Sequence, residues 1–264
     1  MSNIKLYNGD CLEIMKDISD NSIDLILCDL PYGVLNKSNN SAKWDSLIPL
    51  EKLWAEYKRI ITDNGAIILF GQGMFTAKLM LSNEKMWRYN LIWKKGNRAS
   101  GFLNAHRQPM RNHEDIIVFS KKQTVFNPIM REGQKSHSRG NNYSSVQNRC
   151  YGEFKQIEKE QTDKKFPLSV INVEREHPQK YHPTQKPVAL LEYLIKTYSF
   201  IGDTVLDNCM GSGSTGVACK NTDRNFIGIE LEKKYFDIAD DRINNVHLSK
   251  EQIIAEIEGQ LKLI

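Results

Sequence analysis

The fold of this chain is decided by one stretch, Ile23-Asp24-Leu25-Ile26-Leu27-Cys28-Asp29-Leu30-Pro31-Tyr32. Its first six residues form a largely apolar run, which is typical of a strand buried on both faces of a parallel sheet. An acidic side chain, a carbonyl group, a proline that fixes φ and an aromatic ring follow at the carboxyl end, where parallel sheets hold their functional loops. Asp29 and the Leu30 carbonyl can accept the two protons of an exocyclic amine, and Tyr32 can stack on the ring that carries it.

Strand-like and helix-like patterns alternate on both sides of this stretch. Apolar strand patterns occupy residues 4–7, 66–70, 88–93, 115–119, 204–206 and 226–229. Helical spacing of apolar residues covers 53–61, with Asn64-Gly65 as a stop, and returns after Pro187 and over 232–246. This alternation predicts an α/β fold with a mostly parallel sheet.

Composition limits the class of protein. The 264 residues are 40% hydrophobic and 26% charged, enough for one large domain or for one domain that carries an insertion. No apolar run approaches the ~20 residues of a membrane span, and the first residues lack a signal-peptide core. The five cysteines never form a Cys-x-x-Cys pair, so we expect a reduced, cytoplasmic protein without a metal site.

Residues 121–180 differ from the rest of the chain. They contain 12 Lys or Arg and 7 Asp or Glu, an excess larger than the net charge of +4 of the whole chain. Periodicity fades here, and the aromatic residues Tyr143, Tyr151, Phe154 and Phe166 lie among the basic ones. The pattern fits either a disordered surface insertion or a nucleic-acid surface, and the aromatic residues favour the second interpretation.

A glycine-rich turn predicts a cofactor site. The strand at 204–206 runs into Asp207-Asn208-Cys209-Met210-Gly211-Ser212-Gly213, and a helix follows. Glycines let the backbone approach a ligand closely. Glu230 stands at the end of the next strand, a position from which a carboxylate typically binds ribose hydroxyls. The spacing is not that of a dinucleotide site and no Walker motif is present, so we expect another nucleoside-containing cofactor.

Three motifs in this order resemble one known family. They are Asp29-Leu30-Pro31-Tyr32, His182-Pro183-Thr184-Gln185-Lys186-Pro187 and Asp207 to Gly213. Together they are similar to Asp-Pro-Pro-Tyr, His-Pro-Thr-x-Lys-Pro and Asp-Pro-Phe-x-Gly-Ser-Gly of the circularly permuted β group of amino-directed DNA methyltransferases. The resemblance implies S-adenosylmethionine as cofactor and a Rossmann-like, seven-stranded, mostly parallel sheet with helices on both faces. It also implies a catalytic half at 1–120, a small irregular target-recognition insertion at 121–180 and a cofactor-binding half at 181–264.

The same resemblance assigns roles to residues of this sequence. The catalytic residues would be Asp29, Leu30, Pro31 and Tyr32, and an acidic first position favours the N6 amine of adenine over the N4 amine of cytosine. Glu230 would bind the cofactor ribose and Asp10 its adenine. The remaining cofactor-binding candidates are Cys11, Asp29, His182, Thr184, Lys186, Asp207, Met210, Gly211, Ser212 and Gly213. Leu30 and Asn208-Cys209 depart from the family pattern, and the sequence does not show what holds the Leu30 carbonyl in place.

The expected partner is double-stranded DNA, from which the target base must be flipped before it is methylated. Candidate phosphate contacts are Lys94, Lys95, Arg98, Arg107 and Arg111. A cognate restriction endonuclease and a second copy of the chain are further candidate partners. Methylation of cytosine N4, methylation of RNA adenine and nucleic-acid binding without catalysis are the alternatives.

Overall fold

The structure is a computed structural model that describes residues 2–33, 45–97, 99–133, 147–148, 152–153, 163–175 and 185–244. The chain forms two compact units. The larger comprises Met1–Asn127 and Ser169–Ile264, and the smaller comprises Pro128–Leu168. Each is described by itself below.

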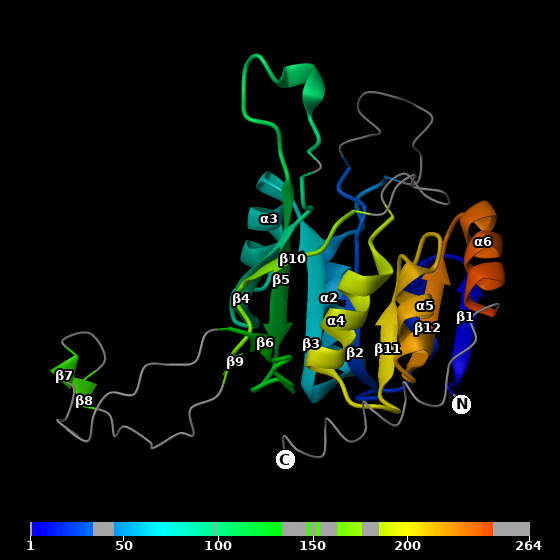
Figure 1. Ribbon diagram of the computed structural model, residues 1–264. Coiled ribbons are helices and arrows are strands. Elements are labelled where there is room, and N and C mark those ends of the chain that lie inside the picture. The colour runs from blue at the N-terminus through cyan, green and yellow to red at the C-terminus, as the bar shows by residue number, and fades with distance from the viewer. Residues whose placement is uncertain are drawn as a thin grey trace. The chain divides into compact units, whose positions relative to one another are not determined.

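An eight-stranded sheet forms the centre of the larger unit (Figure 1). In spatial order its strands are β1 (Ile4–Asn8), β12 (Asn225–Glu230), β11 (Thr204–Asp207), β2 (Ile23–Cys28), β3 (Ile61–Gly71), β5 (His113–Ser120), β4 (Trp87–Lys94) and β10 (Val170–Asn172). All neighbouring strands are parallel except the two pairs that involve β5. The predicted mostly parallel sheet is therefore confirmed.

Helices cover both faces of this sheet. They are α1 (Cys11–Ile14), the 3-10 turn η1 (Met15–Asp17), α2 (Leu50–Ile60), α3 (Met74–Ser82), α4 (Val188–Tyr198), α5 (Ser214–Asn221) and α6 (Lys233–Asn244). A further 3-10 turn, η2 (Phe102–Asn104), lies in the exposed connection between β4 and β5. The side chains of β2 alternate between two buried clusters. Leu25 and Leu27 share one cluster with apolar residues of α4, α5 and α6, whereas Ile26 and Cys28 share the other with residues of α1, α2 and α3. This arrangement explains why β2 is apolar almost throughout.

The topology creates a switch point between β2 and β11. The chain leaves β2 through α2 towards β3, and it leaves β11 through α5 towards β12, on the other side. In open α/β sheets, ligands bind at the carboxyl edge beside such a switch point. Asp29 and Asp207 stand at the ends of these two strands, so the fold itself brings two distant motifs together.

Two details differ from the prediction, and the place of the first strand in the sheet is a third that was not predicted. The sheet has eight strands rather than seven, because β10 adds three residues beside β4. β3 begins at Ile61, directly after α2, and Asn64-Gly65 lies within it, where the pairing with β2 shifts register instead of ending the helix. β1 pairs with β12, so the first strand lies beside the strands formed by the C-terminal half of the chain.

The smaller unit contains two short antiparallel pairs. β6 (Arg131–Glu132) pairs with β9 (Lys164–Lys165), and β7 (Gln147–Asn148) pairs with β8 (Gly152–Glu153). The Arg131 guanidinium donates a hydrogen bond of 3.0 Å to the carbonyl oxygen of Phe166. Tyr143, Tyr151, Phe154 and the chain after Asn244 lie outside the described residues. Across the described part of the chain, no helix is long and apolar enough to cross a membrane.

Candidate active site

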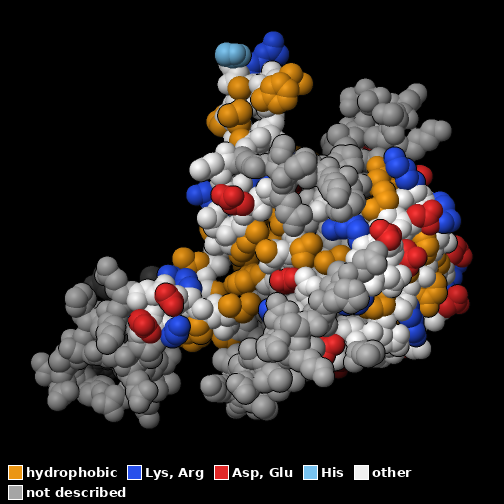
Figure 2. All heavy atoms as spheres, turned by 45° about the vertical axis from the view of Figure 1, so that its right-hand side comes forward, with side chains coloured by type: hydrophobic (Ala, Val, Ile, Leu, Met, Phe, Trp, Pro, Cys, Tyr) orange, Lys and Arg blue, Asp and Glu red, His pale blue; other side chains and the backbone are white. Residues whose placement is uncertain are grey.

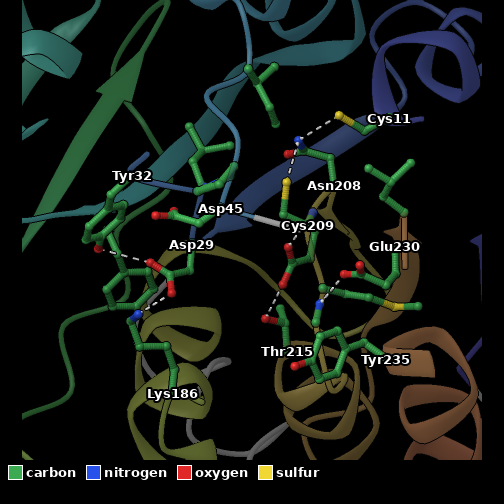
Figure 3. Close-up of a pocket in the computed structure, with 18 of the residues that line it drawn as sticks. Cys11, Asp29, Tyr32, Asp45, Lys186, Asn208, Cys209, Thr215, Glu230 and Tyr235 are labelled. Carbon is green, nitrogen blue, oxygen red and sulfur yellow. Dashed lines mark hydrogen bonds and ion pairs between the residues drawn. The ribbon is translucent and has the colours of Figure 1, made fainter. Parts of the chain in front are cut away.

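Carboxylates gather at the carboxyl edge of the sheet, around a cavity of about 450 Å³ (Figure 3). Asp29 follows β2, Asp207 ends β11 and Glu230 ends β12, which are three adjacent strands. Glu114 reaches the same edge from the start of β5, because that strand runs in the opposite direction. All four residues line the cavity.

Four charges of alternating sign form a buried chain at one end of this cavity. The Lys186 ammonium pairs with Asp29 and lies 3.4 Å from Oε2 of Glu114. Oε1 of Glu114 in turn lies 2.5 Å from Nζ of Lys95. The side chains of Lys95 and Lys186 are only 6% and 8% exposed. Such burial is tolerated because each ammonium group is paired with a carboxylate.

Burial and pairing together shift the pKa of three residues in this row of charges. Burial would lower the pKa of Lys186, but Asp29 and Glu114 raise it above its ordinary value. Burial would likewise raise the pKa of Glu114, yet Lys186 and Lys95 offset this effect and the pKa is lowered. For Asp29 burial prevails, so its pKa is raised although Lys186 limits the rise. Of the two carboxylates in this row of charges, Asp29 is therefore the one whose pKa is raised.

Tyr32 and Leu30 complete this end of the cavity. The Tyr32 hydroxyl donates a hydrogen bond of 3.0 Å to Oδ1 of Asp29, and its ring stacks on Phe75 with a centroid distance of 4.6 Å. The Leu30 side chain is buried, 3% exposed, in the cluster beneath α2. Leu30 thus stands with its side chain in the core at the position where the family has its first proline.

The glycine-rich turn is held by two of the carboxylates. Asp207 accepts hydrogen bonds of 2.6 Å from the Thr215 hydroxyl and 3.1 Å from the backbone N–H of Cys209. Glu230 accepts hydrogen bonds of 2.9 Å from the backbone N–H of Gly211 and of 2.8 Å from that of Glu232. Burial raises the pKa of Asp207 to about 6 and also raises that of Glu230.

Comparison with known proteins identifies the family. Residues 23–241 match the family model for DNA methylase of the N6/N4 type. The chain belongs to this DNA methylase family. The type II methyltransferase M.HinfI of Haemophilus influenzae is 30% identical to the methylase over 91% of this chain and 68% of its own length. M2.MboI of Moraxella bovis is 27% identical over 99% of this chain and 96% of its own.

Solved structures agree with this assignment. The crystal structure of the M1.HpyAVI–SAM complex has a TM-score of 0.60 and 28% identity, and covers 91% of the methylase and 99% of that chain. The cytosine-N4-specific PvuII methyltransferase has a TM-score of 0.66 at 15% identity, over 99% and 94% of the two chains, a likeness in fold alone. The protein is an S-adenosylmethionine-dependent DNA methyltransferase.

The methylase brings most of its predicted site residues to one cavity. Those that line it are Asp10, Cys11, Asp29, Leu30, Pro31, Tyr32, Lys186, Asp207, Met210, Gly211, Ser212 and Glu230. Gly213 lies behind this wall instead. A Cβ atom there would come within 2.8 Å of the Ala239 Cβ, so this glycine is required for the packing of α5 against α6. His182 and Thr184 fall outside the described residues.

The candidate phosphate contacts divide into two groups. Lys94, Arg107 and Arg111 are exposed on the hairpin that joins β4 to β5, and Arg98 lies outside the described residues. Lys95 contradicts the prediction. It is buried and pairs with Glu114, because strand alternation puts it on the same side as the buried Trp93.

Sequence reasoning missed several residues of the cavity wall. Glu114 and Asp45 are two of them, and the buried Asp45 accepts a hydrogen bond of 2.9 Å from the N–H of Gly33. Asn208, which stands where the family has proline, accepts a hydrogen bond of 2.5 Å from the Tyr57 hydroxyl. Its amide group also donates to Sγ of Cys11 at 3.5 Å. The sequence places Glu114 next to a predicted strand at 115–119. It does not show in which direction that strand runs in the sheet, and so it does not place Glu114 at the cavity.

Proposed function

We propose that this methyltransferase transfers the methyl group of S-adenosylmethionine to the N6 amine of adenine in double-stranded DNA. One observation carries the proposal: Asp29, a carboxylate with a raised pKa, lies at the cavity between a tyrosine ring and a shared lysine. An adenine amine is a weak nucleophile because its lone pair is delocalised into the ring. A preorganised acceptor for its protons is therefore the main contribution that the protein can make.

Asp29 and the Leu30 carbonyl would each accept one proton of the amine. A carboxylate has about four lone-pair sites, and Tyr32 and Lys186 use two of those on Asp29. Room for the amine thus remains without breaking either contact. The two acceptors draw the nitrogen towards tetrahedral geometry and localise its lone pair for an in-line attack. The raised pKa of Asp29 makes it a stronger acceptor for the proton that the amine releases.

Lys186 and Tyr32 would adjust this acceptor. Because Lys186 is paired with both Asp29 and Glu114, its charge would stay compensated while Asp29 accepts the amine. The Tyr32 ring has Phe75 on one face, and the other face would stack on the flipped adenine. Pro31 fixes the backbone between them.

The opposite end of the cavity would bind the cofactor, which supplies an electrophilic methyl group on a sulfonium. Glu230 retains lone pairs for ribose hydroxyls beyond the two N–H groups that it accepts. Asp10, whose carboxylate caps α1 through the N–H of Leu12 at 2.8 Å, would face the adenine of the cofactor together with Cys11. Asp207, Met210, Gly211 and Ser212 would contact the methionine portion, and Thr184 and Lys186 would lie near its carboxylate. His182 is a further cofactor-binding candidate.

Target recognition is assigned to the insertion at 121–180, between the catalytic half at 1–120 and the cofactor-binding half at 181–264. Its net positive charge supports contact with DNA phosphates. Lys94, Arg107 and Arg111 would add phosphate contacts, with Arg98 as a further candidate. The same proposal includes two further partners, a cognate restriction endonuclease and a second copy of the methyltransferase. It also includes a cytoplasmic location.

The direct test is to incubate the protein with labelled S-adenosylmethionine and unmodified DNA, and to analyse the nucleosides. N6-methyladenine supports the proposal. N4-methylcytosine would assign the other amine, label in RNA but not DNA would change the substrate, and cofactor binding without product would show a protein without catalysis.

Two substitutions at Asp29 test the mechanism. Asp29→Ala removes one acceptor and should lower the methylation rate on the order of 10²-fold or more, while cofactor affinity is largely retained. Asp29→Asn keeps an oxygen acceptor, so it should recover part of the rate. Turnover near the wild-type rate in Asp29→Ala would refute the mechanism.

A further inference from the structure

The hairpin between β4 and β5 exposes apolar side chains at its tip. Phe102 and Leu103 are 73% and 83% exposed, and Met110 is 52% exposed. Figure 2 shows apolar and basic side chains together at the end of this hairpin, beyond the body of the unit. Exposed apolar patches that are rimmed by polar residues are typical of interaction sites.

The tip is ordered by its own backbone. Ser100 and Arg111 exchange hydrogen bonds of 2.8 and 3.0 Å, which continue the hairpin beyond Lys94. Gly101, with φ of +88°, then starts the turn η2, in which the N–H of Ala105 donates to the Phe102 carbonyl at 3.1 Å. Phe102 and Leu103 are therefore held in solvent by a defined turn.

The charge of the hairpin indicates its partner. From Lys85 to His113 the sequence contains no acidic residue, whereas Lys94, Arg107 and Arg111 are exposed along the hairpin. The hairpin extends from the amino end of β5, at the edge of the sheet that carries Asp29. A small apolar tip between cations matches the base stack and phosphates of DNA, and it is too small for a stable dimer interface of roughly 800 Å² per partner.

We infer that Phe102 and Leu103 form a wedge that enters the base stack of DNA at the target and helps to open it. Arg107 and Arg111 would bind the flanking phosphates and hold the hairpin in place. The inference rests on the proposed function, because a buried active site needs the target base outside the duplex. An apolar wedge contributes most where a base pair must be broken, since it replaces the stacking that the flipped base loses.

The test compares two DNA duplexes that carry the recognition sequence, which is first read from methylated bases in DNA of cells that express the protein. In one duplex the target base is paired, and in the other it faces an abasic site, which lowers the cost of flipping. The variant is Phe102→Ala with Leu103→Ala. The control is Leu81→Ala, which removes a side chain that is 69% exposed on the last turn of α3.

On the paired duplex we expect the double variant to lose about 10- to 100-fold in kcat/KM, the factor that corresponds to about 1.4 to 2.8 kcal/mol. On the abasic duplex it should lose less than about threefold, and Leu81→Ala should match the wild type on both. Arg107→Ala should weaken binding to both duplexes equally and reduce the salt dependence of binding. The fluorescence of 2-aminopurine at the target should rise on binding of the wild type and less with the double variant.

Equal losses on both duplexes, or no loss on either, would overturn the wedge. So would a change of oligomeric state in the double variant, because the tip would then contact a second copy. If the wild type methylates cytosine, the proposed adenine chemistry fails. The wedge is then tested with two duplexes in which the methylated cytosine is either paired or opposite an abasic site. The same pattern of losses is expected of the double variant.

Discussion

Replacing Glu114 by glutamine tests whether the alternating charges at the cavity stabilise the protein as a unit. The change removes the carboxylate between Lys186 and Lys95, whose side chains are 8% and 6% exposed. Lys186 keeps Asp29, but Lys95 is left beside the Trp93 ring, 5.2 Å from its centroid. Loss of one partner of a buried ion pair costs roughly 3–5 kcal/mol. Because the glutamine oxygen still accepts a hydrogen bond, we expect a loss of about 3 kcal/mol in the free energy of unfolding.

The assay is equilibrium unfolding in urea at neutral pH, and Asp63→Asn is the matched control. Asp63 pairs with Lys122 at 2.7 Å, but both side chains are more than half exposed, so the same chemical change should leave stability almost unaltered. The double variant Glu114→Gln with Lys95→Met should recover much of the loss, because no unpaired ammonium group remains.

The pH dependence gives a second check. The pKa of Glu114 is lowered in the folded protein. The contribution of this carboxylate to the free energy of unfolding is therefore complete above pH 4.5, the ordinary pKa of the group, and disappears as pH falls through the lower pKa of the folded state. The difference between wild type and Glu114→Gln should shrink accordingly below about pH 4.5. A loss under 1 kcal/mol at neutral pH, or one equal to that of Asp63→Asn, would refute this account.

Three further predictions concern the cofactor half. Burial raises the pKa of Asp207 to about 6, so the stability of the wild type relative to Asp207→Asn should fall by up to about 3 kcal/mol as pH rises from about 4 to about 6, and then stay level. Urea unfolding of both proteins across this pH range measures the difference in stability, and a difference that does not change with pH would contradict the prediction. Glu230→Gln should weaken S-adenosylmethionine binding about 10- to 100-fold by calorimetry, since a hydrogen bond to a charged group contributes about 1.5–3 kcal/mol; unchanged affinity would exclude Glu230 from the site. Gly216→Ala should cost about 1–3 kcal/mol of stability by overpacking, because its Cβ would come within 2.7 Å of Phe226; a thermal midpoint equal to that of the wild type would disprove the close packing.

The sequence predicted those parts of the site that are encoded locally. The strands before Asp29, Asp207 and Glu230 are short apolar runs that end in loop residues, so each carboxylate could be placed at a strand end without knowing the fold. Parallel pairing then puts such ends at one edge of the sheet.

Glu114 shows why the rest could not be predicted. It is the second residue of β5, and only the reversed direction of this strand brings its amino end to the edge of the sheet that carries Asp29. The direction of a strand depends on its distant partners, about which the local pattern carries no information. β10 was missed for another reason: with three residues, of which Ile171 is the buried one, it has no periodicity to detect.

The buried side chain of Leu30 links the reaction to the interior of the protein. Where a proline ring would restrict the catalytic loop by its own covalent structure, here the restriction comes from side-chain packing beneath α2. Substitutions in that cluster should therefore displace the proposed amine acceptor before they unfold the chain. If the Leu30 carbonyl is the amine acceptor that we propose, the methyltransferase should lose activity on heating ahead of its global unfolding.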